Sequence, residues 1–359
     1  MKLVLGLMSG TSLDGVDIAL VRTDGETIEE LSSFKSYPFD EDFREEIRKG
    51  FGQKEGLEAL ESEVTNRHIQ AVERFLQSEG ITRSDVDLIG FHGQTVFHEP
   101  ENGLTIQLGD GADMARAVGI DVVNDLRTAD VKAGGQGAPL VPIFHAALTK
   151  DMHKPIAVLN LGGVGNVTWI GEDGELIAFD TGPANALVDD WVKKHTGKAF
   201  DENGEIAGAG EVDDAAVNTF MTHPYFAQPV PKSLDRDEFK RIAFDLVDDL
   251  SVEDGAATLT AFTVAAVMRA QDFFPELAEL WIVCGGGRLN KSMMSAFNAY
   301  LHGCILSAED VGWDGDAIEA QAFAYLAARA EKGLPITFPG TTGVSTPLTG
   351  GEFHSHTPK

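Results

Sequence analysis

The segment that decides the fold is KLVLGLMSGTSLDGVDIALV, which runs from Lys2 to Val21. An apolar stretch leads into a turn rich in glycine and hydroxyl groups, and a second apolar stretch follows it. Apolar runs on both sides of such a turn predict two paired strands. Because glycine has no Cβ, the backbone N–H groups of the turn are open to an anion such as phosphate.

A second segment of the same kind, IAVLNLGGVGNVTWI, runs from Ile156 to Ile170. One hairpin therefore opens each half of the chain. We interpret the two hairpins as the phosphate-binding turns of two similar domains that hold one polyphosphate between them. The sequence thus indicates a nucleotide-binding clamp.

The chain has 359 residues, of which 43% are hydrophobic, which suits two domains of about 150 residues each. We expect a first domain at residues 1–140 and a second at 141–359, with a C-terminal tail that can pack back on the first. Helical and extended patterns alternate almost throughout, which predicts an α/β fold. The stretch from Gly333 onward is rich in Gly, Thr and Pro, and we expect it to be mobile or loosely docked.

The charge and the cysteines limit the class of protein. With 28 basic and 57 acidic residues the net charge is −29, which opposes nonspecific binding to nucleic acid or to anionic membranes. Two cysteines without zinc or disulfide spacing predict a reducing compartment. The apolar run after Lys2 is too short for a signal peptide, and no stretch is apolar enough to span a membrane. We therefore expect a cytoplasmic protein.

The first loop has the composition of a phosphate site. Its hydroxyl and N–H groups suit terminal phosphates, and Asp14 or Asp17 could hold a hydrated Mg²⁺. An ordinary polar hairpin turn is the alternative, but hairpin turns are usually shorter. The candidate nucleotide-binding residues here are Gly10, Thr11, Ser12, Leu13, Asp14, Gly15, Val16 and Asp17.

Further glycine turns extend this prediction. The second hairpin contributes Gly162, Gly163 and Asn166. A third segment, LWIVCGGGRLN at Leu280–Asn290, reads as a strand, three glycines and a helix start, where adenosine or the α-phosphate can approach the backbone. It is not the dinucleotide fingerprint, and no Walker A motif is present. Its candidate residues are Gly285, Gly286, Gly287 and Asn290.

Asp180 lies at the end of a predicted strand, in the segment Asp180–Asn185 that opens a helix. A carboxylate in such a place suits a general base. The alternative is a helix N-cap, with Pro183 near the first helical position. In the first half, polar residues in the segments Gly90–His98, Asn124–Asp130 and Gly134–Pro139, which come after two predicted strands, suit a sugar that carries a carboxylate or amide.

The motif MSGTSLDGVD at Met8–Asp17 closely resembles the signature of the anhydro-N-acetylmuramic acid kinase family. The resemblance continues in the same order over nearly the whole chain. It includes HGQT at His92–Thr95, the segments Asp125–Pro139, Asn160–Gly163, Asp180–Asn185 and Cys284–Asn290, and EAQAFA at Glu319–Ala324.

This resemblance implies the two-domain actin-like fold of acetate and sugar kinases, with duplicated mixed-sheet domains around a nucleotide cleft. It implies a kinase that uses ATP and Mg²⁺, opens 1,6-anhydro-N-acetylmuramic acid with water and phosphorylates its 6-oxygen in peptidoglycan recycling. It further implies that Asp180 activates the water and that Glu319 lies on the nucleotide side, near Mg²⁺. The residues that it implies on the sugar side are Gln94, Thr95, Asp125 and Arg127. Whether the protein forms a homodimer is left open by the sequence.

Two other functions compete with this interpretation. The first is another actin-like sugar kinase that phosphorylates a free hydroxyl without opening a ring. The second is a non-enzymatic actin-like ATPase whose cleft drives partner binding or filament assembly. The residues alone indicate only ATP-dependent phosphoryl transfer to a small polar acceptor.

Overall fold

The computed structural model describes residues 1–234 and 238–357, and the chain divides into two compact units. The first unit consists of residues 1–150 and 317–359, and the second of residues 151–316. The division therefore differs from the expected boundary after residue 140. The chain after Asp316 belongs with the first unit because a long helix in it packs on the first sheet.

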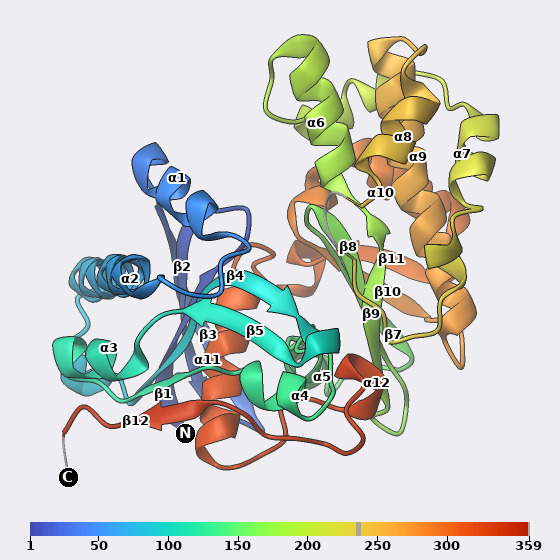
Figure 1. Cartoon of the computed structure of the whole chain (residues 1–359). Coiled ribbons are helices and arrows are strands. Elements are labelled where there is room, and N and C mark those ends of the chain that lie inside the picture. Colours follow the sequence, from blue (N-terminus) through green and yellow to red (C-terminus); the bar gives the residue numbers. More distant parts are fainter. Residues whose placement is uncertain (235–237, 358–359) are drawn as a thin grey trace. The chain divides into compact units, whose positions relative to one another are not determined.

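The first unit is built on a seven-stranded mixed sheet with the order β12-β6-β4-β1-β2-β3, in which β5 also pairs with β4 (Figure 1). β1, β2 and β3 form an antiparallel meander, and β4 and β6 run parallel to β1. The strands are β1 (Lys2–Ser9), β2 (Gly15–Thr23), β3 (Ile28–Pro38), β4 (Leu88–Glu99), β5 (Leu104–Leu108), β6 (Val122–Asn124) and β12 (Glu352–His354).

The helices of this unit begin and end at recognisable signals. Asp40 caps α1 by accepting a hydrogen bond from the N–H of Phe43, and Gly80 ends α2 in the left-handed conformation at φ 67°. The helices are α1 (Glu41–Gly50), α2 (Glu58–Glu79), α3 (Gly111–Val118), α4 (Thr128–Lys132), α5 (Pro142–Leu148), α11 (Ile318–Glu331) and α12 (Pro339–Thr342).

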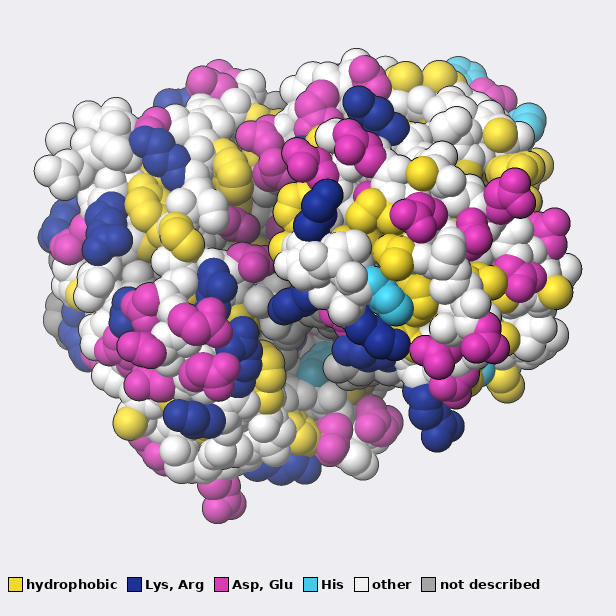
Figure 2. All heavy atoms as spheres, turned by 90° about the horizontal axis from the view of Figure 1, so that it is seen from above, with side chains coloured by type: hydrophobic (Ala, Val, Ile, Leu, Met, Phe, Trp, Pro, Cys, Tyr) yellow, Lys and Arg dark blue, Asp and Glu magenta, His cyan; other side chains and the backbone are white. Residues whose placement is uncertain are grey.

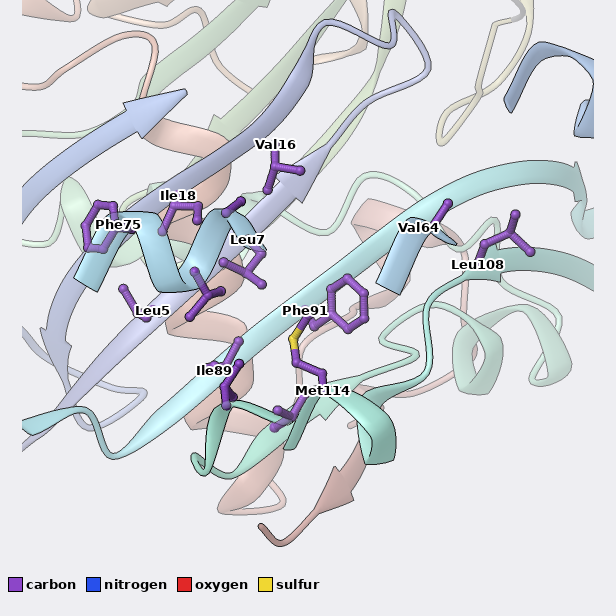
Figure 3. Close-up of a cluster of buried hydrophobic side chains, with 14 of the residues drawn as sticks. Leu5, Leu7, Val16, Ile18, Val64, Phe75, Ile89, Phe91, Leu108 and Met114 are labelled. Carbon is purple, nitrogen blue, oxygen red and sulfur yellow. The ribbon is translucent and has the colours of Figure 1, made fainter. Parts of the chain in front are cut away.

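Side chains of β1 alternate between two cores, as the period of a strand requires. Leu5 and Leu7 join a core that includes Val64 and Phe75 of α2 (Figure 3). On the other face, Val4 packs with residues of α11 such as Phe323 and Leu326. The sheet is thus covered on both faces, and α11 forms the cover of one of them.

The second unit contains a five-stranded sheet with the order β11-β10-β7-β8-β9. Here too a meander, β7–β8–β9, is followed by two parallel strands. The order β9-β8-β7-β10-β11 repeats the order β3-β2-β1-β4-β6 of the first unit. This repetition confirms the predicted duplicated mixed-sheet α/β fold. The strands are β7 (Ile156–Leu161), β8 (Val164–Ile170), β9 (Leu176–Pro183), β10 (Leu280–Cys284) and β11 (Cys304–Ser307).

Two cores stabilise the second unit. One lies between the sheet and helices α9 and α10, around Trp169 and Trp281. The other joins α6, α7, α8 and α9 around an aromatic group in which the rings of Phe220 and Phe262 stack with centroids 4.2 Å apart. The helices are α6 (Asn185–Thr196), α7 (Asp214–Phe220), α8 (Lys240–Val247), α9 (Val252–Ala270) and α10 (Lys291–Tyr300).

Three local expectations were wrong. Asp180 lies inside β9, and the segment from His92 to His98 lies inside β4, so neither follows a strand. The C-terminal stretch is not loosely docked: β12 pairs with β6 and Thr337 bridges to Leu348. Backbone pairing explains this difference, which the high Gly, Thr and Pro content concealed. Pro358 and Lys359 lie outside the described residues.

The surface reflects the acidic composition. Figure 2 shows Asp and Glu side chains spread over the displayed face, with Lys and Arg among them. In the described part of the chain, no helix combines the length and the apolar character that crossing a bilayer requires.

Two glycines allow α11 to approach the first sheet closely. A Cβ on Gly6 of β1 would lie 1.8 Å from the carbonyl oxygen of Ala320, and one on Gly90 of β4 would lie 2.1 Å from that of Phe323. Neither distance is sterically possible, so any side chain here displaces the helix. Gly10, by contrast, has room, because its nearest neighbour would be the Ser12 hydroxyl at 3.6 Å.

We therefore expect Gly6→Ala to lower the free energy of unfolding by about 1–3 kcal/mol, the usual range for overpacking. Gly10→Ala is the matched control and should change it by less than about 0.5 kcal/mol. Denaturant unfolding of both variants measures the difference. Equal stabilities would contradict the close approach of α11.

Candidate active site

The turn between β1 and β2 is held in a tight conformation. The N–H of Leu13 donates to the carbonyl oxygen of Gly10 over 3.2 Å, and Leu13 adopts φ 62°. A positive φ is a genuine outlier for a bulky residue. Such outliers often accompany function, because the surrounding structure must maintain them.

The eight predicted residues of this turn divide into two groups. Leu13 and Val16 are buried in the core of the first unit, and a Cβ on Gly15 would lie 2.3 Å from the carbonyl oxygen of Tyr37. These three residues shape the turn and offer only backbone atoms. The exposed polar side chains are those of Thr11, Ser12 and Asp14, beside the open Gly10, and Asp17 is half-buried in β2.

Hydrogen bonds join this turn to β4. The hydroxyl of Ser9 donates to the carbonyl oxygen of Gly93 over 2.9 Å. The Nε2 group of Gln94 donates to the carbonyl oxygen of Gly10 over 3.2 Å. Gln94 is fully buried, so its amide braces the turn, whereas Thr95, next in β4, is half-buried.

Asp125 and Arg127 lie beyond the end of β6. Asp125 has φ 50°, and burial raises the pKa of its carboxyl above the usual value. Arg127 Nη1 donates to the carbonyl oxygen of Gly137 over 2.7 Å, and Nη2 lies 2.9 Å from Nε2 of His92. Burial lowers the pKa of Arg127 to about 10, against attraction from Glu319 and Asp130.

Glu319 begins α11 on the face of the sheet that carries Asp17. Crowding by neighbouring protein atoms raises the pKa of its carboxyl, the charge of Arg127 opposes the rise and repulsion from Asp17 adds to it, although part of the residue is open to solvent. Each of these residues belongs to the first unit. The first unit thus brings together Arg127, Glu319 and Asp17, which are far apart in the sequence.

In the second unit, Asp180 is fixed through its backbone. β9 is the edge strand of its sheet, and a following segment covers that edge. The N–H of Asp180 donates to the carbonyl oxygen of Lys232 over 3.0 Å, and the hydroxyl of Tyr225 donates to the carbonyl oxygen of Asp180 over 2.6 Å. Both backbone groups of this edge residue are therefore satisfied.

The Asp180 carboxyl is also oriented. Its Oδ2 accepts a hydrogen bond of 2.8 Å from the N–H of Leu234. Desolvation raises its pKa to about 7, although this hydrogen bond acts in the opposite direction. A carboxyl with a pKa near neutrality can accept and release a proton at physiological pH.

The helix-capping interpretation of Asp180 is wrong. The N-cap of α6 is Ala184, and no side chain caps this helix. Instead, the carbonyl oxygens of Gly162 and Gly163 accept hydrogen bonds from the N–H groups of Asn185 and Ala184. The first turn of α6 is thereby attached to the β7–β8 turn.

A polar row crosses the second sheet beside Asp180. Asn166 of β8 pairs with Asp180 of β9 on one side and with Asn160 of β7 on the other. Residues paired in this way share one face of a sheet. Asn166, predicted for the nucleotide, is thus the cross-strand neighbour of the candidate base.

The third glycine segment follows β10. Gly285 has φ 72°, and a Cβ there would lie 2.3 Å from Oδ1 of Asn160. Gly286 is exposed, and Gly287 packs against Leu161. Asn290 caps α10 by accepting from the N–H of Met293 over 3.0 Å, so its side-chain oxygen has a structural partner.

Sequence reasoning missed three residues of these clusters: His92, Asn160 and Tyr225. His92 and Asn160 lie within the motifs that carried the family resemblance, which was the available signal. Tyr225 lay outside every motif, and only the fold brings it to Asp180. Among residues 1–234 and 238–357, no group of three His, Cys, Asp or Glu side chains is arranged to hold a metal ion.

The chain is similar to known proteins over almost its whole length. A model of the family described as anhydro-N-acetylmuramic acid kinase matches residues 2–355. The protein of that name from Paramagnetospirillum magneticum is 52% identical over 352 residues, which cover 98% of this chain and 99% of the relative. The one from Rhodospirillum rubrum is 51% identical over 355 residues, which cover 97% of this chain and 93% of the relative.

One solved structure shows a distant likeness. Component A of the (R)-2-hydroxyglutaryl-CoA dehydratase of Acidaminococcus fermentans is 12% identical, with a TM-score of 0.49, over 91% of this chain and 99% of its own. A similarity of this size says nothing about the reaction.

Proposed function

Because the chain belongs to the anhydro-N-acetylmuramic acid kinase family, we propose that it opens 1,6-anhydro-N-acetylmuramic acid with water and phosphorylates the freed 6-oxygen with ATP. The observation that carries the hydrolytic half is the Asp180 carboxyl, which accepts a hydrogen bond from the N–H of Leu234 and whose pKa burial raises to about 7. Hydrogen bonds to the backbone N–H and carbonyl groups of Asp180 hold the residue in place. Such a group is suited to deprotonate water.

The proposed reaction joins hydrolysis of the anhydro bond to phosphoryl transfer from ATP. Asp180 takes a proton from a water molecule as the water oxygen bonds to the anomeric carbon. The bond from that carbon to the 6-oxygen breaks, and the 6-oxygen keeps the electron pair. It then bonds to the γ-phosphorus of ATP while the bond from the γ-phosphorus to the bridging oxygen breaks, which releases ADP. The proton on Asp180 passes to solvent.

In this proposal the glycine turns bind the nucleotide. Open backbone N–H groups and the hydroxyls of Thr11 and Ser12 bind the terminal phosphates in the first unit. In the second unit, the turns at Gly162–Gly163 and Gly285–Gly287 approach the nucleotide through the backbone. Asn166 orients Asp180 or the water, and Asn290 contributes by fixing the start of α10.

The acceptor side and a magnesium ion are assigned within the first unit. Gln94, Thr95, Asp125 and Arg127 are assigned to the sugar side, and Gln94 also donates to the carbonyl oxygen of Gly10 in the phosphate turn. Asp17 and Glu319 suit Mg²⁺, since Glu319 lies close enough to Asp17 to feel its charge and magnesium usually takes one or two carboxylates beside phosphates. The ion would neutralise phosphate charge during transfer.

The wider role follows from the substrate. We propose a place in peptidoglycan recycling, in the cytoplasm, with ATP and the anhydro sugar as partners and no part for nucleic acid or membrane. A homodimer is compatible with this role. A sugar kinase that acts on a free hydroxyl, or an actin-like ATPase without a sugar, remain the functions to be tested against it.

The product distinguishes these functions. After incubation with Mg-ATP and 1,6-anhydro-N-acetylmuramic acid, we expect the sugar to gain the mass of one water and one phosphate, together with a new reducing end. A gain of phosphate alone would exclude the hydrolytic step. ATP consumption without any sugar product would favour the ATPase.

We expect Asp180→Asn to lower turnover by about 10²–10⁴-fold, the usual contribution of a positioned base. The variant keeps the shape of the side chain and should bind both substrates nearly normally. Asp173→Asn, in an exposed turn of the same unit, is the control and should keep full activity. Retention of more than about a tenth of wild-type turnover by Asp180→Asn would exclude Asp180 as the base.

The same carboxyl predicts the pH dependence of turnover. Its pKa is raised to about 7, so it is protonated and inactive as a base below this pH. Turnover should therefore rise with pH through about 7 and level off above it. A profile that is flat from pH 5 to 9 would contradict this assignment.

Gly10→Val tests the phosphate turn. The site has space for a side chain without backbone clash, so the variant should fold, but its methyl groups would occupy the approach of the phosphates. Calorimetry should show weaker ATP binding with an unchanged affinity for the sugar. Unchanged ATP affinity in the folded variant would place the phosphates elsewhere.

A further inference from the structure

His92 occupies an unusual position beside Arg127. The imidazole is buried, with 5% of the residue exposed, on the face of the first sheet that α11 covers. Its ring lies edge-on to Phe323 with centroids 4.6 Å apart. Neither the reaction above nor any motif assigns a task to this side chain.

The hydrogen bonds of His92 fix where its proton lies. Nδ1 is 2.7 Å from the carbonyl oxygen of Gly93, which can only accept, so Nδ1 carries the proton. Nε2 is 2.9 Å from Nη2 of Arg127 and 3.2 Å from Nε2 of Gln107, which both donate. The imidazole is therefore neutral, with its lone pair facing the guanidinium. Burial and the charge of Arg127 lower the pKa of His92 well below its usual value.

Arg127 is held without being neutralised. Its two hydrogen-bond partners, the lone pair of His92 and the carbonyl oxygen of Gly137, are both uncharged. Across the described residues no carboxylate forms a contact ion pair with it, although Glu319 and Asp130 attract it from further away. Its Nε group is buried and has no hydrogen-bond partner. A donor left in this state is costly unless a ligand satisfies it.

We propose that His92 is a positioning residue that orients the Arg127 guanidinium for an anionic oxygen of a substrate while leaving its positive charge intact. This inference rests on the proposed function, since it takes Arg127 to bind a substrate. The anionic oxygen belongs to the carboxylate of the sugar or to a phosphate of ATP.

A neutral acceptor is the group that this task requires. A carboxylate in the place of His92 would pair with Arg127 and cancel its charge. A protonated imidazole would repel the guanidinium and donate where an acceptor is needed. The contacts with Gly93, Gln107 and Phe323 keep the ring in the one orientation that presents its lone pair.

Two amide substitutions of His92 test the roles of the two ring nitrogens separately. In His92→Gln the side-chain oxygen can reach the position of Nε2 and accept from Arg127. In His92→Asn the shorter amide can keep the contact with Gly93 but withdraws the acceptor. Both replace a ring by an amide, so a purely structural defect should affect both, and thermal unfolding checks this point.

We expect His92→Asn to raise the KM of one substrate by about 10-fold or more, with a smaller change in kcat, because a hydrogen bond to a charged group is lost. His92→Gln should stay within about 3-fold of the wild type. Separate titrations of sugar and ATP show which of them supplies the anion. In Arg127→Ala the further change His92→Asn should add little.

Several outcomes would overturn the inference. Equal defects in His92→Asn and His92→Gln, or a full additional effect of His92→Asn in Arg127→Ala, would show that His92 does not act through Arg127. Wild-type kinetics of His92→Asn alongside a defective Arg127→Ala would reject the inference and leave the proposed function intact. Wild-type kinetics of Arg127→Ala would reject the sugar-side assignment of Arg127 together with the inference.

A measurement on the unaltered protein complements the variants. The ¹⁵N chemical shifts of the His92 ring report which nitrogen carries the proton. We expect a protonated Nδ1 and a bare Nε2 that stay unchanged from pH 6 to pH 9. A proton on Nε2 in this range would overturn the inference even if a variant failed to fold.

Discussion

The contact between α11 and the first sheet is the constraint on which the rest of that unit depends. Gly6 and Gly90 have no side chains, so the helix backbone lies directly against β1 and β4. This proximity brings Glu319 near Asp17 and sets Phe323 against the ring of His92. The polar cluster of the first unit therefore depends on a helix that begins only at Ile318, far along the chain from Asp17, His92 and Arg127.

The two units set the charge states of Asp180 and Arg127 in different ways. In the second unit, desolvation brings the pKa of Asp180 to about 7 while backbone contacts at an edge strand hold it in place. In the first unit, uncharged acceptors hold Arg127, so its charge is kept. Asp180 can therefore exchange a proton near neutral pH, whereas Arg127 remains a cation. The proposed reaction needs both properties, one for deprotonating water and one for binding an anion.

Local patterns in the sequence predicted much of this structure. β10 was expected at Leu280–Cys284 and is found there, because a short apolar run before glycines has few alternatives. A C-terminal tail that packs back on the first domain was expected, but the inclusion of α11 in it was not, since the apolar pattern of this helix does not say which sheet it covers. Asn290 shows the same limit at the site: its residue type suits a ligand or a helix cap, and only the structure reveals the cap. The role of His92 could be inferred only after its hydrogen-bond partners were known.

The discontinuous first unit has a consequence for synthesis on the ribosome. Residues 151–316 form the second unit from one uninterrupted stretch, so this unit can complete its fold as soon as it has emerged. The first unit lacks α11 and β12 until residues 318–354 have been made. Until then the nascent chain exposes the glycine-lined face of the first sheet and the unpaired edge of β6. Chaperones bind surfaces of this kind, and such surfaces also promote aggregation. A segment that is made late therefore covers a sheet whose strands are made early.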